Sequence, residues 1–191
     1  LDMVGRIVEA AGDVPVSADL DNGYDDPAET TRRAIGVGIV GANVEDRLLP
    51  VAESAARVAA VVGAADAEGV PFALNARTDA FVRGGDKPVE EKIADAIERG
   101  RAYLDAGADI IFVPGVLDAD VTRQLVAGIG ERKVSVIGLP GALAAAEYEA
   151  LGVGRISYGP TTQRVALTAL QDVAKSLYAD GVIPGSTRAL N

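Results

Sequence analysis

The sequence predicts an α/β fold built on a parallel sheet. Short apolar runs alternate with stretches that show helical periodicity. The apolar runs are nearly continuous rather than alternating, as expected of strands that helices cover. Successive runs begin about 20 to 37 residues apart, which is the length of one βα unit. Repeated βα units leave two layouts, a doubly wound open sheet or a (β/α)8 barrel.

Six strands are predicted from the apolar runs. In chain order they are Val14–Asp19, Gly41–Asp46, Pro71–Thr78, Ala108–Gly115, Val134–Gly141 and Gly154–Pro160. A barrel needs eight strands and about 250 residues, so two more units of this size would bring the 191 residues close to one. No Gly-rich phosphate loop follows the first strand, which leaves a dinucleotide-binding open sheet unsupported.

Seven helices are predicted between and around these strands. Residues 1–11 have the pattern of the end of a helix whose start is absent. The long helices are favoured by apolar stripes, and Pro50 and Gly69 suit the first and last positions of one of them. The remaining predicted helices are Pro27–Val37, Pro50–Gly69, Pro88–Ala106, Asp118–Ile129, Ala142–Leu151 and Thr161–Asp180.

The composition excludes several chemistries. The chain has neither His nor Cys, so a thiol nucleophile, a Ser-His-Asp triad and a His- or Cys-ligated zinc are ruled out. The net charge of −10 argues against nucleic acid and against an anionic membrane surface. No apolar run reaches the ~18 residues that span a bilayer, and no signal peptide is visible. We therefore expect a cytoplasmic enzyme.

Polar residues gather at the carboxyl ends of the predicted strands, which share one face in a parallel barrel. Asp19, Asp21 and Glu45 are three carboxylates expected to converge there. Such a group favours Mg²⁺, or Mn²⁺, because hard cations prefer oxygen ligands. The alternative for the two aspartates is a turn rich in turn-forming residues, with Asp26 capping the next helix.

Arg77 ends the third strand and is the first candidate catalytic residue, with the role of holding a substrate carboxylate. Its alternative is a structural salt bridge to Asp46 or Glu45. Tyr24 is the second candidate catalytic residue. The alternative is that it lines the wall of the site and only forms hydrogen bonds, as a Tyr at the top of a barrel more often does. The predicted substrate-binding residues are Gly23, Asn75, Arg77 and Ser157.

Four motifs in register on successive strands carry a family resemblance. They are Asp19-x-Asp21-x-Gly23-Tyr24, Gly41-x-x-x-Glu45-Asp46, Asn75-Ala76-Arg77-Thr78-Asp79-Ala80, and Gly107-Ala108-Asp109 with Phe112-Val113-Pro114-Gly115. From about Val14 to Pro160 the chain resembles the isocitrate lyase/phosphoenolpyruvate mutase superfamily. The resemblance implies a (β/α)8 TIM barrel whose first two βα units are absent, so residues 1–191 are expected to form one N-terminally incomplete barrel domain.

The resemblance also implies a function. The positions matching Asp19, Asp21 and Glu45 hold Mg²⁺, directly or through water, and the position matching Arg77 binds the carboxylate of the substrate. Members cleave or form C–C or P–C bonds of small 2-oxo or hydroxy acids through an enolate-like species. Many are homo-oligomers, so a dimer or tetramer is expected.

One departure narrows the reaction. The isocitrate and methylisocitrate lyases resemble one another in a Cys-containing loop after the Glu-Asp pair, whereas here Arg47-Leu48-Leu49-Pro50 follows and a helix begins. The longer gating loop of the mutases is missing as well. The leading hypothesis is a Mg²⁺-dependent lyase for a 2-oxo or hydroxy (di)carboxylic acid. The alternatives are a non-catalytic 2-oxo acid binding protein, a phosphonomutase- or hydrolase-type member, and an unrelated open-sheet enzyme.

Overall fold

The structure is a computed structural model of the chain, and it describes residues 1–188. The chain divides into two compact units, Leu1–Ser157 and Tyr158–Asn191, and each is described by itself. Within the described residues, no helix combines the length and the apolar character needed to cross a membrane.

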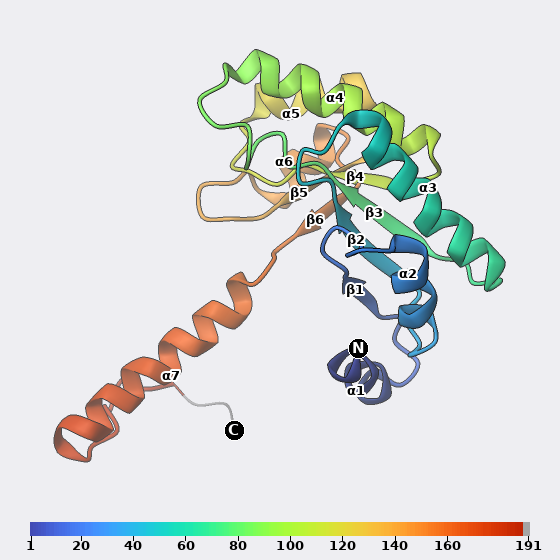
Figure 1. Cartoon of the computed structure of the whole chain (residues 1–191). Coiled ribbons are helices and arrows are strands. Elements are labelled where there is room, and N and C mark those ends of the chain that lie inside the picture. Colours follow the sequence, from blue (N-terminus) through green and yellow to red (C-terminus); the bar gives the residue numbers. More distant parts are fainter. Residues whose placement is uncertain (189–191) are drawn as a thin grey trace. The chain divides into compact units, whose positions relative to one another are not determined.

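The first unit is organised around a six-stranded sheet, as predicted. The strands are β1 (Ser17–Asp19), β2 (Gly41–Glu45), β3 (Ala73–Arg77), β4 (Ile110–Phe112), β5 (Val134–Ile137) and β6 (Arg155–Ser157). They pair in parallel in the order of the chain, β1 to β6, and form a half-barrel (Figure 1). A doubly wound sheet would reverse its strand order partway, so the chain order excludes that layout.

The helices lie where the periodicity predicts them. The first unit contains α1 (Asp2–Ala11), α2 (Pro27–Ile35), α3 (Val51–Ala67), α4 (Val89–Asp105), α5 (Ala119–Ile129) and α6 (Ala145–Ala150). Most bounds agree with the prediction to within two residues, and the largest difference is α6, which begins at Ala145 instead of Ala142. The backbone turns at Gly141, which has a φ of 89°, and the carboxylate of Glu147 accepts the Ala144 N–H at 2.8 Å.

The apolar core lies between the sheet and its helices. Leu74 and Ile111 of the sheet, with Ala96 of α4 and Leu125 of α5, are almost completely buried members of one cluster. Helices α3, α4 and α5 follow one another over the sheet (Figure 1). A Cβ atom at Gly100 would lie 2.9 Å from Ile129, so glycine at this position allows α4 and α5 to approach closely. This packing fixes the strands whose ends carry the polar residues.

The second unit consists mainly of α7 (Thr161–Asp180). It ends as predicted at Gly181, which adopts a left-handed conformation with a φ of 74°. The Gly181 N–H donates to the Leu177 carbonyl at 3.1 Å and closes the last turn.

Candidate active site

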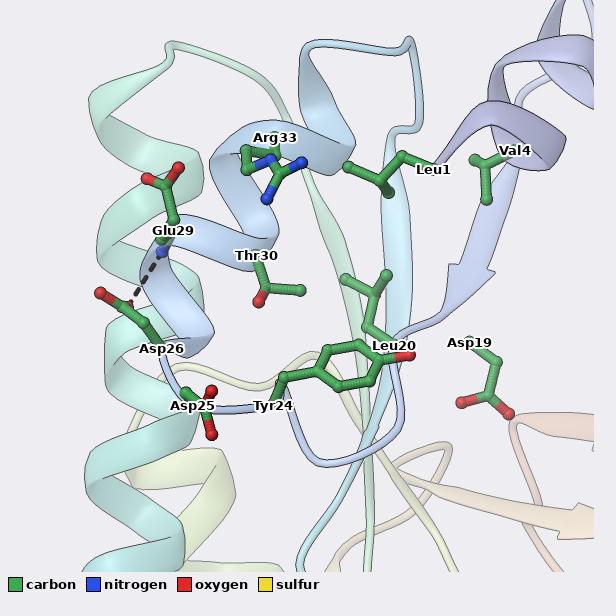
Figure 2. A pocket seen from close by; sticks show the side chains of 10 residues that line it. All are labelled: Leu1, Val4, Asp19, Leu20, Tyr24, Asp25, Asp26, Glu29, Thr30 and Arg33. Atoms are coloured by element: carbon green, nitrogen blue, oxygen red, sulfur yellow. Dashed lines mark hydrogen bonds between the residues drawn. The ribbon is translucent and has the colours of Figure 1, made fainter.

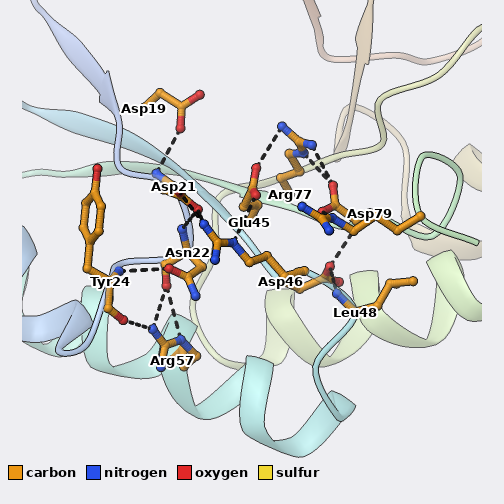
Figure 3. Close-up of polar contacts among 12 residues, drawn as sticks. Asp19, Asp21, Asn22, Tyr24, Glu45, Asp46, Leu48, Arg57, Arg77 and Asp79 are labelled. Atoms are coloured by element: carbon orange, nitrogen blue, oxygen red, sulfur yellow. Dashed lines mark hydrogen bonds and ion pairs between the residues drawn. The ribbon is translucent and has the colours of Figure 1, made fainter.

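The carboxyl ends of β1, β2 and β3 bring the predicted acidic and basic residues to one edge of the sheet. The strand register pairs Asp19 with Asn43 and Glu45 with Arg77. Figure 3 shows Asp19, Asp21, Glu45 and Arg77 together at this edge. The four side chains therefore lie at one edge of the sheet, and their roles in binding a metal and a substrate stay predictions.

The loop after β1 is held in an unusual backbone conformation. Asp21 and Tyr24 both have a φ of 55°, a left-handed value that residues other than glycine seldom adopt. The carboxylate of Asp19 accepts the Asp21 N–H at 3.0 Å. Arg57 of α3 donates to the carbonyl of Asn22 at 2.9 Å and to that of Tyr24. These bonds fix the direction in which Asp21 presents its carboxylate.

Arg47 lies between two of the predicted metal ligands. One of its terminal nitrogens is 2.5 Å and 2.6 Å from the two carboxylate oxygens of Asp21. Its Nε atom lies 3.6 Å from an oxygen of Glu45. The hydrogen bond from Arg47 holds the pKa of Asp21 below its ordinary value. No sequence pattern predicted a role for Arg47, whose guanidinium contacts both Asp21 and Glu45.

Arg77 is engaged by two carboxylates. Its Nη1 atom lies 2.9 Å from an oxygen of Glu45, and Nε and Nη2 each lie 2.8 Å from the buried Asp79. Arg83 contacts the other oxygen of Asp79 at 2.7 Å. The salt bridge to Glu45 is one of the two considered from sequence. Asp46 instead contacts Arg77 through its backbone N–H, which donates to the Arg77 carbonyl at 3.0 Å, while its carboxylate pairs with Arg99. Each terminal nitrogen of Arg77 carries two hydrogens, so donors are left for a ligand.

The pKa of Glu45 is subject to opposing effects. Burial raises its pKa, Arg77 opposes the rise, and the charges of Asp79, Asp21 and Asp19 add to it. Bringing further positive charge to this edge would relieve that repulsion.

The donor set suits a hard divalent cation, since it consists of carboxylate oxygens alone. However, no group of three acidic side chains in residues 1–188 is arranged to hold a metal ion. Arg47 engages Asp21 and Arg77 engages Glu45 in this geometry. The set of Asp19, Asp21 and Glu45 therefore fits a metal by its chemistry, whereas its present arrangement is that of an ion-pair network.

A buried network under the site was missed by sequence reasoning. One oxygen of Asp46 accepts the backbone N–H groups of Leu48 and Asp79, at 2.9 and 3.0 Å. The other accepts the Tyr103 hydroxyl at 2.7 Å and Arg99 Nη1 at 3.2 Å. Burial raises the pKa of Tyr103, and the charge of Asp46 raises it further. Asp46 thus joins the loop after β2, the end of β3 and helix α4.

Three of the predicted residues have other surroundings. The Gly23 N–H donates to the Leu20 carbonyl and its own carbonyl accepts from Thr30, so Gly23 shapes the loop instead of offering a free backbone group. Asn75 donates to Asn43 at 2.8 Å, and its side-chain oxygen is buried without a partner among the described residues. Ser157 ends β6, at the opposite end of the strand order from β1.

Tyr24 lies on a cleft beside the acidic edge. Its side chain is 59% exposed, and it lines a space of about 520 Å³ together with Asp19, Thr30 and Arg33. Figure 2 shows the ring of Tyr24 extending along this cleft next to Leu20. The Glu45–Arg77 pair does not line this cleft, so the two predicted catalytic residues, Arg77 and Tyr24, line different spaces.

The half-barrel and its charged carboxyl-end residues are features of the barrel class of α/β proteins, in which this end carries the active site. A family model described as phosphoenolpyruvate phosphomutase matches residues 1–178. The chain belongs to this family, within the phosphoenolpyruvate mutase/isocitrate lyase superfamily.

Individual relatives support the assignment. The chain is 32% identical to 2,3-dimethylmalate lyase of Eubacterium barkeri, over 96% of this chain and 68% of that protein. It is 30% identical to phosphoenolpyruvate phosphomutase of Streptomyces hygroscopicus, over 97% and 63%. A solved phosphonopyruvate hydrolase complex with oxalate and Mg²⁺ superposes with a TM-score of 0.77 at 26% identity, covering 100% and 69%. The chain therefore spans about two thirds of the length of these proteins.

Proposed function

We propose that this protein is a Mg²⁺-dependent lyase that cleaves a C–C bond in a small 2-oxo or hydroxy (di)carboxylic acid. The observation that carries the proposal is the grouping of Asp19, Asp21, Glu45 and Arg77 at adjacent strand ends. Relatives that carry the names of lyases, a mutase and a hydrolase for small carboxylic acids support the class.

Asp19, Asp21 and Glu45 are the residues that would hold the cation, with Mn²⁺ as a possible substitute for Mg²⁺. The oxygen-only donor set supports this assignment, and so does the Mg²⁺ in the complex of the related hydrolase. A bound divalent cation supplies Lewis-acid charge that stabilises the negative charge developing on a 2-oxo acid during bond cleavage. The three carboxylates would hold the cation at the edge of the sheet that also carries Arg77.

Arg77 binds a carboxylate of the substrate in this proposal. Its guanidinium is oriented by Glu45 and Asp79, so little conformational freedom is lost when a ligand binds. The planar fork of an arginine matches a carboxylate, and Lys would offer a single point charge instead. Arg77→Lys should therefore raise KM by about 10- to 100-fold, the range that follows from losing one charge-assisted bidentate contact.

Tyr24 is the proposed donor of the proton that the enolate takes up after bond cleavage. Its hydroxyl group is on an exposed side chain at the cleft that Asp19 also lines, so it can approach a substrate bound at the acidic edge. Asn75 and Ser157 are proposed to line the substrate space from the sheet, and Gly23 supports the loop that carries Tyr24.

The relatives leave the reaction open among lyase, mutase and hydrolase chemistry, and the chain itself narrows it. The isocitrate lyases resemble one another in a loop with an acid–base Cys. This chain has no Cys and cannot use that chemistry. Bond cleavage followed by protonation from Tyr24 or water needs no such residue. Decarboxylation, hydrolysis and retro-aldol cleavage are the reactions to test.

The test is a turnover assay by ¹H and ³¹P NMR with purified protein. Oxaloacetate, 2,3-dimethylmalate, 2-methylisocitrate and phosphonopyruvate are each incubated with Mg²⁺ or with chelator. We expect one of these acids to be consumed only when Mg²⁺ is present. Asp19→Asn should consume it more slowly than the parent protein. The control Arg123→Gln, which removes an exposed arginine from α5, should consume it at the rate of the parent protein. Turnover that persists in chelator, or in Asp19→Asn, would contradict the proposal. Mg²⁺-dependent binding without any turnover would favour the non-catalytic binding protein.

A further inference from the structure

We propose that Arg47 occupies the cation position between Asp21 and Glu45 and that its guanidinium must leave before a divalent cation binds. The inference rests on the proposed function, because it concerns the same carboxylates. In this proposal Arg47 and the divalent cation compete for the carboxylates of Asp21 and Glu45. The outcome of that competition sets the affinity for the metal.

The contacts of Arg47 are those of a counterion. A single terminal nitrogen contacts both carboxylate oxygens of Asp21, at 2.5 and 2.6 Å, and Nε lies 3.6 Å from Glu45. Asp21 and Glu45 are therefore both contacted by one positive group. Figure 3 shows Asp21 and Glu45, the two acidic side chains that Arg47 contacts, at the same edge of the sheet.

The loop after β2 allows the Arg47 side chain to leave Asp21 and Glu45 while the loop backbone stays folded. Arg47 and Leu48 have left-handed φ values of 48° and 57°, and the Leu48 N–H is held by the buried Asp46 at 2.9 Å. The side chain of Arg47 is 44% exposed, so rotation about its own bonds carries the guanidinium into solvent. The backbone anchor at Asp46 stays in place during that movement.

Electrostatics favour the exchange when a divalent cation is present. Glu45 is repelled by Asp19, Asp21 and Asp79, and Arg47 supplies one positive charge against this group. A divalent cation supplies two charges and binds oxygen at shorter range than a guanidinium does. Without a cation, Arg47 keeps Asp21 and Glu45 from repelling each other.

Removal of Arg47 should therefore tighten cation binding. Exposed ion pairs are individually weak, and Arg47 makes one close pair and one longer contact, so we expect about tenfold tighter binding in Arg47→Gln. Arg47→Lys keeps the charge but not the fork, and it should fall between the two. The matched control is Arg123→Gln, which removes an arginine that forms an exposed ion pair with Asp120 on α5.

The experiment titrates Mn²⁺ into chelator-treated purified protein and measures free Mn²⁺ by electron paramagnetic resonance. Melting curves without metal establish that each variant is folded. The inference is supported if Arg47→Gln binds Mn²⁺ about tenfold more tightly than the parent protein and Arg123→Gln does not. Equal or weaker binding by a folded Arg47→Gln overturns it while leaving the metal site standing. Failure of every variant to bind Mn²⁺ removes the proposed function as well.

A second measurement needs no variant that could fail to fold. In the parent protein, the ¹H–¹⁵N resonance of the Arg47 side-chain Nε should shift when Mg²⁺ is added, because the group leaves Asp21 and Glu45. The Nε resonance of Arg123 serves as the internal control and should stay in place. An unchanged Arg47 resonance while Mg²⁺ binds would contradict the proposed displacement.

Discussion

Tyr103→Phe should destabilise the protein by removing one hydroxyl group from the buried network below the site. Tyr103 is 1% exposed, and its hydroxyl donates to Asp46 at 2.7 Å and accepts from Arg99 at 3.3 Å. The phenylalanine ring keeps the packing, so the lost hydrogen bonds alone determine the effect. A hydrogen bond to a charged group contributes about 1.5–3 kcal/mol to stability.

The magnitude is reduced by the partners that remain. Arg99 still donates to Asp46 at 3.2 Å and to the Leu49 carbonyl at 2.8 Å, so neither charge is left alone. We therefore expect a loss of about 2 kcal/mol in the free energy of unfolding. For a chain of this size, that loss corresponds to a melting temperature about 4–8 °C lower.

The assay is urea denaturation followed by circular dichroism, with linear extrapolation to water. The control is Tyr178→Phe, since Tyr178 is 93% exposed on α7 and should change stability by less than about 0.5 kcal/mol. If Tyr103→Phe costs no more than Tyr178→Phe, the Asp46 network does not support the site in the way described.

Two further predictions concern the loops that carry the acidic residues. Gly23 and Gly69 both have left-handed φ values, 80° and 67°, and alanine at such a position costs about 1–2 kcal/mol. A Cβ at Gly23 would also lie 2.8 Å from Pro27, whereas the space around Gly69 is open, so urea denaturation should show the larger loss for Gly23→Ala. For Asp21, ¹³C NMR should give a carboxyl pKa below its ordinary value of 3.8, and Arg47→Gln should raise it. Because the folded pKa is lowered, this pair stabilises the protein above that ordinary value, and the contribution is lost as the pH falls through the folded pKa. An unchanged Asp21 pKa in Arg47→Gln would contradict the ion pair.

The layout of strands and helices could be predicted because it depends on patterns that act over a few residues. Buried parallel strands are continuously apolar, and α3, α4 and α7 follow their apolar stripes. The order of the strands needed the structure, since both open sheets and barrels are built from the same βα units. The cap on α2 belonged to the alternative in which Asp19 and Asp21 form a turn, and the Asp26 carboxylate does accept the Glu29 N–H at 3.0 Å.

The partners within the site could be predicted only in part. Residues at the ends of parallel strands share an edge, so the grouping of Glu45 with Arg77 follows from their positions. The role of Arg47 depends on two successive left-handed residues, a conformation that no local pattern of Arg47-Leu48 predicts. Similarly, nothing near Tyr103 in the sequence indicates the hydrogen bond that its hydroxyl donates to Asp46.

The central proposal is a site that binds the carboxylate of a small acid when a divalent cation is present. Its residues are Asp19, Asp21, Glu45 and Arg77. Its most direct test is a calorimetric titration of oxalate into the purified protein, with Mg²⁺ and with chelator. We expect oxalate to bind only when Mg²⁺ is present, and at least tenfold more weakly to Arg77→Lys, on the order of one lost charge-assisted contact. Oxalate binding of equal strength in chelator would contradict it.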